Sequence, residues 1–436
     1  MTTSSEPVWR LPLVGAQMLV VAFGSLVLMP LLTGLDPSVA LFTAGVGTLI
    51  FHWITGRTVP VFLASSFAFI APIAYSVHTW GMSATMGALM VTGVLYMLLA
   101  GAVRWRGPGF LHHIMPPVVI GPIIMVIGLA LAPLAVNMAM GKAGDGSAQL
   151  FPYGPALLVS MTALLTTLAL ATLAKGMFRL IPILVGVLAG YVVALLLGMV
   201  DFTPMQEARW VAVPGFVAPS FMWQPILFMI PVAIAPAIEH VGDVLAISNV
   251  TRKDYVTKPG LHRTLLGDGI ATSVAAAFGG PPNTTYSEVT GAVMLTKVFN
   301  PMVMIWAAVF AVLLAFLAKL GAVLQTIPDP VMGGILVLMF GSIAGVGMNT
   351  LIKAQVDMAE PRNLVIVSTT LVFGIGGMAI GDADLSLQGI ALCGVVAIVL
   401  NLVLPRRAPS VVADDLHEEQ ALVNDWLEHG NEDKQP

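Results

Sequence analysis

Charged residues are scarce in this chain. Only 10% of its 436 residues are Asp, Glu, Lys or Arg, whereas 57% are hydrophobic and the mean hydropathy is +0.92. A soluble domain carries about a quarter charged residues. The composition therefore excludes an ordinary soluble domain and predicts an all-α polytopic membrane protein.

The sequence also has little that catalysis or metal binding would need. Its single cysteine, Cys393, lies in an apolar run, which excludes an intramolecular disulfide and a cysteine metal cluster. No histidine/acid cluster with metal-ligand spacing and no Gly-rich phosphate loop is present. We therefore predict a protein that is not an enzyme and that needs no cofactor and no metal. The first residues, MTTSSEPVWRL, lack the basic start and cleavage site of a signal peptide, so we expect the first apolar run to be a retained span.

Long apolar runs are abundant. A span needs about 20 apolar residues, and on that criterion the chain has about fourteen, several of them short or interrupted. Their approximate limits are 12–33, 38–56, 60–77, 82–103, 114–135, 156–175, 180–199, 224–247, 264–280, 286–299, 302–320, 329–348, 362–380 and 385–405. With a cytoplasmic N-terminus, all Lys and Arg residues except Lys142, Arg209 and Lys319 fall on the inner side, as the positive-inside rule requires. We predict a multi-pass protein of the bacterial inner membrane with both termini cytoplasmic.

Two features indicate an internal repeat. The pattern P-x3-G-x6-G occurs at residues 117–128 and again at 330–341, and the odd number of spans between the copies turns the second one upside down. The third and tenth spans are both broken, by SSFAF at 65–69 and by GGPPNTTYSE at 279–288. Non-helical backbone at membrane depth must find partners within the protein. We expect short extended strands at the two breaks to pair near the midplane, each followed by a half-helix whose amides face the gap.

Acids occur where the chain is otherwise apolar. Glu239 and Asp243 share one helix face, whereas His240 points about 100° away. Acids at membrane depth usually face a bundle interior or a substrate path. Asp243 and Asp268 could instead be solvated acids at helix ends, and Glu288 could belong to a polar loop. For His240 the favoured interpretation is a packing histidine.

Paired carboxylates indicate the kind of solute. Low dielectric and like charge both disfavour ionisation of such a pair, so it exchanges protons readily. Carboxylates can also bind the N–H edge of a neutral planar heterocycle. Anion sites, by contrast, use Arg, Lys or bare helix N-termini. The pair therefore predicts proton-coupled uptake of a small polar solute and disfavours a sulfate or phosphate.

The motifs EHVGD at 239–243 and NTTYSE at 283–288, with SSFAF at 65–69, Phe23-Gly24 and IPDPVMGG at 327–334, resemble the nucleobase/ascorbate transporter family. The likeness runs from about Leu11 to Pro405 and is greatest to the bacterial uracil permease branch. It implies proton symport, a homodimer, an elevator-type movement, and about fourteen spans in two inverted repeats. The implied divisions are an N-terminus 1–11, core domain 12–112 and 224–323, gate domain 113–199 and 324–405, external loop 200–223 and acidic cytoplasmic tail 406–436.

The resemblance also assigns roles. Glu239 and Glu288 would hold the base, while the backbone amides of Phe67 and Ser287 would bind its carbonyls. The Phe67 ring would pack on the base. The remaining wall residues would be Ser25 and Tyr286. We add that Asp243 is the proton-coupling partner of Glu239 and that Asp268 supports it.

The chain departs from the uracil permease pattern at several positions. That branch has histidine at the positions of Met18 and Asp243, glycine at Ser287, asparagine at Val289 and arginine at Lys297. Acids corresponding to 243 and 268 are typical of the xanthine and uric acid branch, which has glutamine at 288. We therefore predict uracil or a related pyrimidine first, xanthine or another purine second, and a sulfate-permease-like anion carrier third.

The tail accounts for the net negative charge of the chain, because without its acids the rest is slightly basic. Residues 414–433 could form a short amphipathic helix, although a solvated tail is favoured. Its acidity argues against binding to the anionic cytoplasmic leaflet.

Overall fold

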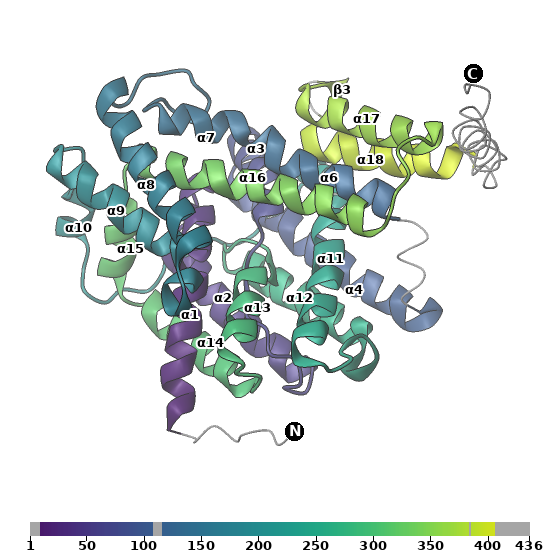
Figure 1. Cartoon of the computed structure of the whole chain (residues 1–436), viewed down its shortest axis with the longest axis horizontal. Helices are drawn as coiled ribbons and strands as arrows, with labels where there is room; N and C mark the ends of the chain where they lie inside the picture. Colours follow the sequence, from purple (N-terminus) through teal and green to yellow (C-terminus); the bar gives the residue numbers. More distant parts are fainter. Residues whose placement is uncertain (1–8, 108–115, 383–384, 406–436) are drawn as a thin grey trace, which may run out of the picture.

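The computed structural model describes residues 9–107, 116–382 and 385–405, and these are mostly helical (Figure 1). The acidic tail at 406–436 lies outside the described residues. Six helices or helix pairs are long and apolar enough to cross a membrane, or up to seven if one pair bent by 82° counts as a span. The helices of the structure overlap each of the expected ranges, but several are short, so the count of about fourteen spans stays a prediction.

The helices pack as two bundles. The first bundle contains α1 (Arg10–Thr33), α2 (Pro37–Ile54), α3 (Ile70–Trp80), α4 (Met82–Arg106), α11 (Trp223–Thr251), α12 (Leu261–Ala277), α13 (Ser287–Thr296) and α14 (Met302–Ala315). Within it, α12 lies against α4 and α2, and α14 lies against α1 and α2. Gly93 of α4 and Gly269 of α12 bring these two backbones into direct contact, because a Cβ on either residue would meet the other helix's carbonyl oxygen.

The second bundle contains α6 (Pro117–Ala130), α7 (Ala132–Ala139), α8 (Tyr153–Leu173), α9 (Pro182–Leu196), α16 (Asp329–Lys353), α17 (Pro361–Ile375) and α18 (Gly389–Val403). Its central helix, α16, packs on α6, α7 and α8. The two helices that begin with the repeated P-x3-G-x6-G pattern, α6 and α16, therefore lie directly against each other. Gly121 of α6 faces Gly347 of α16, which lets the two backbones approach closely.

Short elements join these helices. They are η1 (Phe67–Phe69), η2 (Gly176–Leu180), α10 (Thr203–Glu207), η3 (Val256–Gly260), α15 (Ala318–Gln325) and the hairpin of β3 (Ala379–Asp382) with β4 (Leu385–Gln388). The bundles meet where α11 contacts α6 and α18 and where α1 contacts α9.

Two short strands meet inside the first bundle and form an antiparallel pair, the strand crossing. The strand β1 (Leu63–Ser65) pairs antiparallel with β2 (Asn283–Thr285), and every residue of both strands is buried. The register is Leu63↔Thr285, Ala64↔Thr284 and Ser65↔Asn283. Two further backbone bonds extend the ladder, from the Ser66 amide to the Pro282 carbonyl (2.9 Å) and from the Tyr286 amide to the Phe62 carbonyl (3.3 Å). The breaks in the third and tenth expected spans therefore satisfy each other's backbone groups, as burial requires.

Each strand is also held by a threonine of a neighbouring helix. The Thr48 hydroxyl of α2 accepts from the Leu63 amide (2.9 Å) and donates to the Leu63 carbonyl (3.1 Å). The Thr272 hydroxyl of α12 makes the same two bonds to Asn283, at 3.2 and 3.0 Å. Both threonines are fully buried. The two strands thus begin at matching positions relative to matching helices.

Candidate functional site

Helix α11 of the first bundle carries the polar side chains of Glu239, His240 and Asp243. Glu239 is exposed, Asp243 is 6% exposed and His240 is fully buried. Glu239 and Asp243 lie four residues apart in one continuous helix, so they share a face from which His240 turns away. Burial divides the three differently, because Asp243 and His240 are both buried. Pro236 and Pro231 lie inside the same helix, about one and two turns before Glu239.

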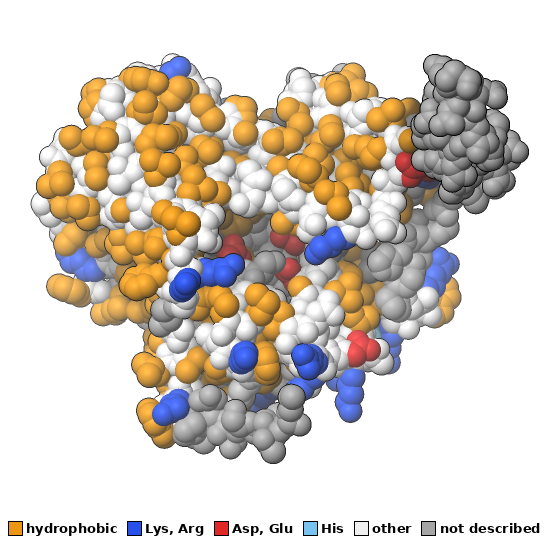
Figure 2. Space-filling model, viewed as in Figure 1, with side chains coloured by type: hydrophobic (Ala, Val, Ile, Leu, Met, Phe, Trp, Pro, Cys, Tyr) orange, Lys and Arg blue, Asp and Glu red, His pale blue; other side chains and the backbone are white. Residues whose placement is uncertain are grey.

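Glu288 is the second residue of α13, directly after β2, and its side chain is exposed. It lies within electrostatic range of Glu239, as does Asp243. Carboxylates exposed within packed helices must border a solvent-filled space. Figure 2 shows a hollow near the centre of one face, with acidic side chains inside it and Lys and Arg side chains around its rim.

Asp243 is tied to the strand crossing. Its Oδ2 accepts a hydrogen bond of 2.7 Å from the Thr285 hydroxyl, the last residue of β2. Thr285 leads into Tyr286 and the first turn of α13, so this bond connects an acid of α11 to the segment that carries Glu288. No sequence pattern indicated this contact, because the two residues are far apart in the chain.

Asp268 lies deeper than a helix-start acid would. It is the eighth residue of α12, its side chain is fully buried, and its Oδ2 is 3.4 Å from Nδ1 of His240. His240 is fully buried, as a packing histidine would be, and its polar neighbour is Asp268. The solvated-acid alternative for Asp268 is wrong, because α4, α2 and α11 surround this part of α12.

The predicted backbone donors lie at helix starts. Phe67 begins η1 and Ser287 begins α13, positions whose amides have no partner within their own helix. Tyr286 is 3% exposed and its hydroxyl donates to the Ser65 carbonyl at 2.9 Å, so it fastens the crossing. Ser25 lies in α1, and the side chains of Ser25 and Ser287 are outside the described part of the structure.

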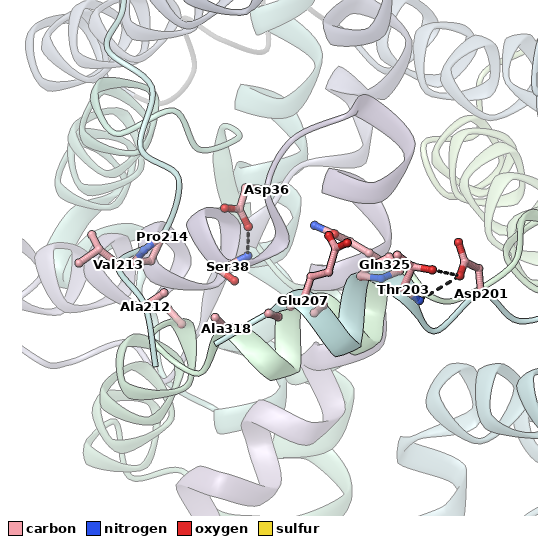
Figure 3. Close-up of a pocket in the computed structure, with 15 residues that line it drawn as sticks. Asp36, Ser38, Asp201, Thr203, Glu207, Ala212, Val213, Pro214, Ala318 and Gln325 are labelled. Atoms are coloured by element: carbon pink, nitrogen blue, oxygen red, sulfur yellow. Dashed lines mark hydrogen bonds between the residues drawn. The ribbon is translucent and has the colours of Figure 1, made fainter. Parts of the chain in front are cut away.

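A second hollow lies elsewhere. A pocket with a volume of about 540 Å³ lies between the start of α2, α10, α15 and the segment around Pro214. Figure 3 shows its lining, which includes none of the predicted site residues. Two of its acids serve the local backbone: Asp36 accepts from the amides of Ser38 and Gly215, and Asp201 accepts from Thr203. Among the described residues, no group of three or more His, Cys, Asp or Glu side chains could hold a metal ion.

The structure has long apolar helices, acids between them, and two broken spans whose strands β1 and β2 pair. These features define a multi-pass membrane protein of the transporter class. Residues 10–383 match the model of the Permease family, Xan_ur_permease. The chain is 58% identical over 393 residues to the probable uracil permease of Pasteurella multocida, covering 90% of this chain and 93% of that protein. It is 38% identical over 387 residues to the uracil permease of Escherichia coli K12, covering 89% of each. The chain belongs to this permease family, which confirms the resemblance seen in its motifs.

Solved structures show the same fold. The transmembrane domain of the cyanobacterial bicarbonate transporter BicA superposes with a TM-score of 0.64 at 15% identity, covering 92% of this chain and 98% of that one. SLC26A9 superposes with a TM-score of 0.67 at 12% identity, covering 91% of this chain and 65% of that one. At such identities the likeness concerns architecture alone.

Proposed function

We propose that this protein is a proton-coupled secondary-active transporter that takes up a nucleobase, with uracil or a related pyrimidine as the substrate. The observation that carries the proposal is the pair Glu239 and Glu288. Two different helices bring these exposed carboxylates together beside a buried strand crossing. The 58% identity to a probable uracil permease supports the choice of base.

The site chemistry suits a planar base with N–H and C=O groups on its edge. In our proposal, Glu239 and Glu288 accept from the ring N–H groups, and the amides of Phe67 and Ser287 donate to its carbonyls. Partial positive charge at the starts of η1 and α13 strengthens those donors. The Phe67 ring packs on the base, and Ser25 and Tyr286 complete the wall.

Proton coupling is assigned to Asp243 with Glu239. A carboxylate oxygen of Asp243 accepts from Thr285. A proton on that oxygen turns it from acceptor to donor, so the Thr285 hydroxyl must reorient or release it. Protonation of Asp243 thereby reaches β2 and the first turn of α13, where Glu288 holds the base. Asp268 is the supporting acid of this group.

We further propose that the first bundle is the moving core and the second bundle the gate of an elevator-type homodimer. The core comprises 12–112 and 224–323, and the gate comprises 113–199 and 324–405, in two inverted repeats of about seven spans. Support comes from the two packing groups and from the matching threonine anchors of β1 and β2. The protein would lie in the bacterial inner membrane with both termini cytoplasmic, as the distribution of Lys and Arg predicts.

The direct test is uptake of labelled uracil into proteoliposomes with and without an imposed inward proton gradient. We expect accumulation that requires the gradient and disappears with a protonophore. Thermal stabilisation by uracil, thymine, cytosine, xanthine, hypoxanthine, uric acid and ascorbate then ranks the substrates. A ligand at a hundredfold its Kd stabilises by about 2.7 kcal/mol. Gradient-independent equilibration of uracil would contradict the coupling, and no stabilisation by any base would contradict the site.

The second candidate is a xanthine or purine permease. The acids Asp243 and Asp268 favour it, and the same panel decides between the two. An anion carrier with the shared fold is the third alternative. Uptake of bicarbonate or sulfate in the same vesicles would support it, although the carboxylates of Glu239 and Glu288 repel an anion.

A further inference from the structure

The inference concerns His240, which the proposed substrate site does not use. Its neighbour Glu239 is exposed, whereas the imidazole is 0% exposed and faces the interior of the first bundle. There it lies against the ring of Phe51 from α2, with 6.3 Å between ring centroids. Helix α11 thus presents a carboxylate to the hollow and an imidazole to its partner helices.

The group that the imidazole meets is Asp268. Nδ1 of His240 and Oδ2 of Asp268 are 3.4 Å apart, and Asp268 is also 0% exposed. Beyond this 3.4 Å contact, the ring nitrogens of His240 and the carboxylate oxygens of Asp268 meet no hydrogen-bond partner within the described residues. Each residue is therefore the other's polar neighbour, on helices that pack side by side.

The surroundings of Asp268 supply negative or neutral groups. Tyr96 of α4 is fully buried and its hydroxyl has no partner among the described residues, while Glu239 and Asp243 of α11 lie within electrostatic range. From α2 comes Phe51, whose neighbour His52 is bound to the Val61 carbonyl at 3.0 Å. Of these described neighbours, His240 is the one whose side chain can take a positive charge that balances Asp268.

A buried charge without a partner is too costly to persist, so the group is paired or becomes neutral. Two arrangements of the pair avoid that cost: a protonated Asp268 beside a neutral His240, or an ionised Asp268 beside an imidazolium. Both contain one proton and no net charge. We propose that His240 and Asp268 form a buried pair that shares one proton, and that His240 is the positioning residue that fixes Asp268 between α11 and α12. Its consequence for transport rests on the proposed function; the pairing itself does not.

The pairing is tested by asking whether a second substitution restores the thermal stability lost in a first one. Tm is measured on the purified full-length protein without substrate. His240→Leu leaves Asp268 without its partner, and we expect the Tm to fall by about 5 °C or more, since breaking a buried pair is strongly destabilising. Adding Asp268→Asn removes the stranded acid, so the double variant should recover at least about half of that loss. A double variant that is no more stable than His240→Leu would overturn the pairing.

His52 offers a matched control. It is another buried histidine, on α2, bonded to a backbone carbonyl instead of an acid. Asp268→Asn should not rescue His52→Leu, and an equal rescue there would also overturn the pairing. Should His240→Leu yield no folded protein, the same comparison is made with His240→Gln, which donates a hydrogen bond but carries no charge.

The positioning role is read from uptake kinetics. His240→Gln should lower the kcat of uracil uptake about tenfold and leave KM within about twofold, since the imidazole faces away from the base. A raised KM with unchanged kcat would overturn this role. Absence of uracil uptake by the unmodified protein would count against the proposed function, whereas the thermal rescue would still decide the pairing.

Discussion

The two strands of the crossing share a scaffold but differ in chemistry. Each is three residues long, each is anchored by a buried threonine hydroxyl, and each leads directly into a helical turn. After β1 that turn is apolar, with Phe67, Ala68 and Phe69, whereas after β2 it contains Ser287 and Glu288. Backbone hydrogen bonds build the crossing, so side chains that make none of those bonds are free to differ between its two sides.

The second α-helix before each strand shows the same contrast. No acid occurs in α1 between Arg10 and Thr33, while α11 carries Glu239 and Asp243. The ionisable groups of the candidate site thus come from the second half of the chain. In the proposed site, the first half would contribute the ring and the backbone amide of Phe67. This division predicts that the two sides of the crossing respond differently to substitution.

The largest effect is expected at Glu239. Glu239→Gln removes a carboxylate from both the proposed base site and the coupling pair, so uracil uptake should fall at least about a hundredfold, close to 3 kcal/mol. Proteoliposome uptake measures it. Glu207→Gln, an exposed acid in the pocket of Figure 3, is the control and should retain uptake. Retained uptake in Glu239→Gln would contradict the proposed site.

Glu288 should give the next largest effect. Glu288→Gln turns one acceptor of the carboxylate into a donor, and uracil binding should weaken about tenfold to a hundredfold, the range for a hydrogen bond to a charged group. The relative affinity for purines should rise. Thermal shifts with the panel of bases measure both changes, and unchanged binding of every base would rule out Glu288 as a ligand.

Asp243 should affect coupling more than binding. Asp243→Asn keeps an acceptor for Thr285 but cannot take up a proton, so uracil binding should change less than about tenfold while gradient-driven accumulation is lost. Uptake measured across external pH, with uracil exchange at zero gradient as the control, separates the two properties. Proton coupling and pH dependence that survive in Asp243→Asn would refute its role.

The sequence predicted the crossing because Pro, Gly and extended segments inside apolar runs must satisfy their backbone groups within the protein. It also predicted that Glu239 and His240 point in different directions, about 100° apart, which follows from helix geometry alone. The contacts of Asp243 with Thr285 and of His240 with Asp268 were not predictable. They join elements whose relative rotation is set by packing, as at Gly93 and Gly269, and no local pattern encodes that rotation.

Tyr96 is another residue whose neighbours could not be predicted from the sequence. In the sequence it is one aromatic residue within an apolar helix, and burial among Leu, Met and Ala would be the ordinary expectation. Its position near Asp268 follows from the contact of α4 with α12. From composition alone, the sequence pointed to candidate residues on separate helices where they were acids, because an acid in an apolar run is energetically costly. The other candidates came from the family resemblance.

The smallest effects are expected at Thr48 and Thr272, the threonines that hold β1 and β2 in the same way. Thr48→Val and Thr272→Val each remove two buried hydrogen bonds to the first residue of a strand, so each should lower the free energy of unfolding by about 1–3 kcal/mol. Because the two anchors have the same geometry, the losses should agree within about 0.5 kcal/mol. Thermal unfolding without substrate measures them, with Thr162→Val, on an exposed face of α8, as the control. A large loss at one threonine and none at the other would show that the strands are held by different interactions despite their matching bonds.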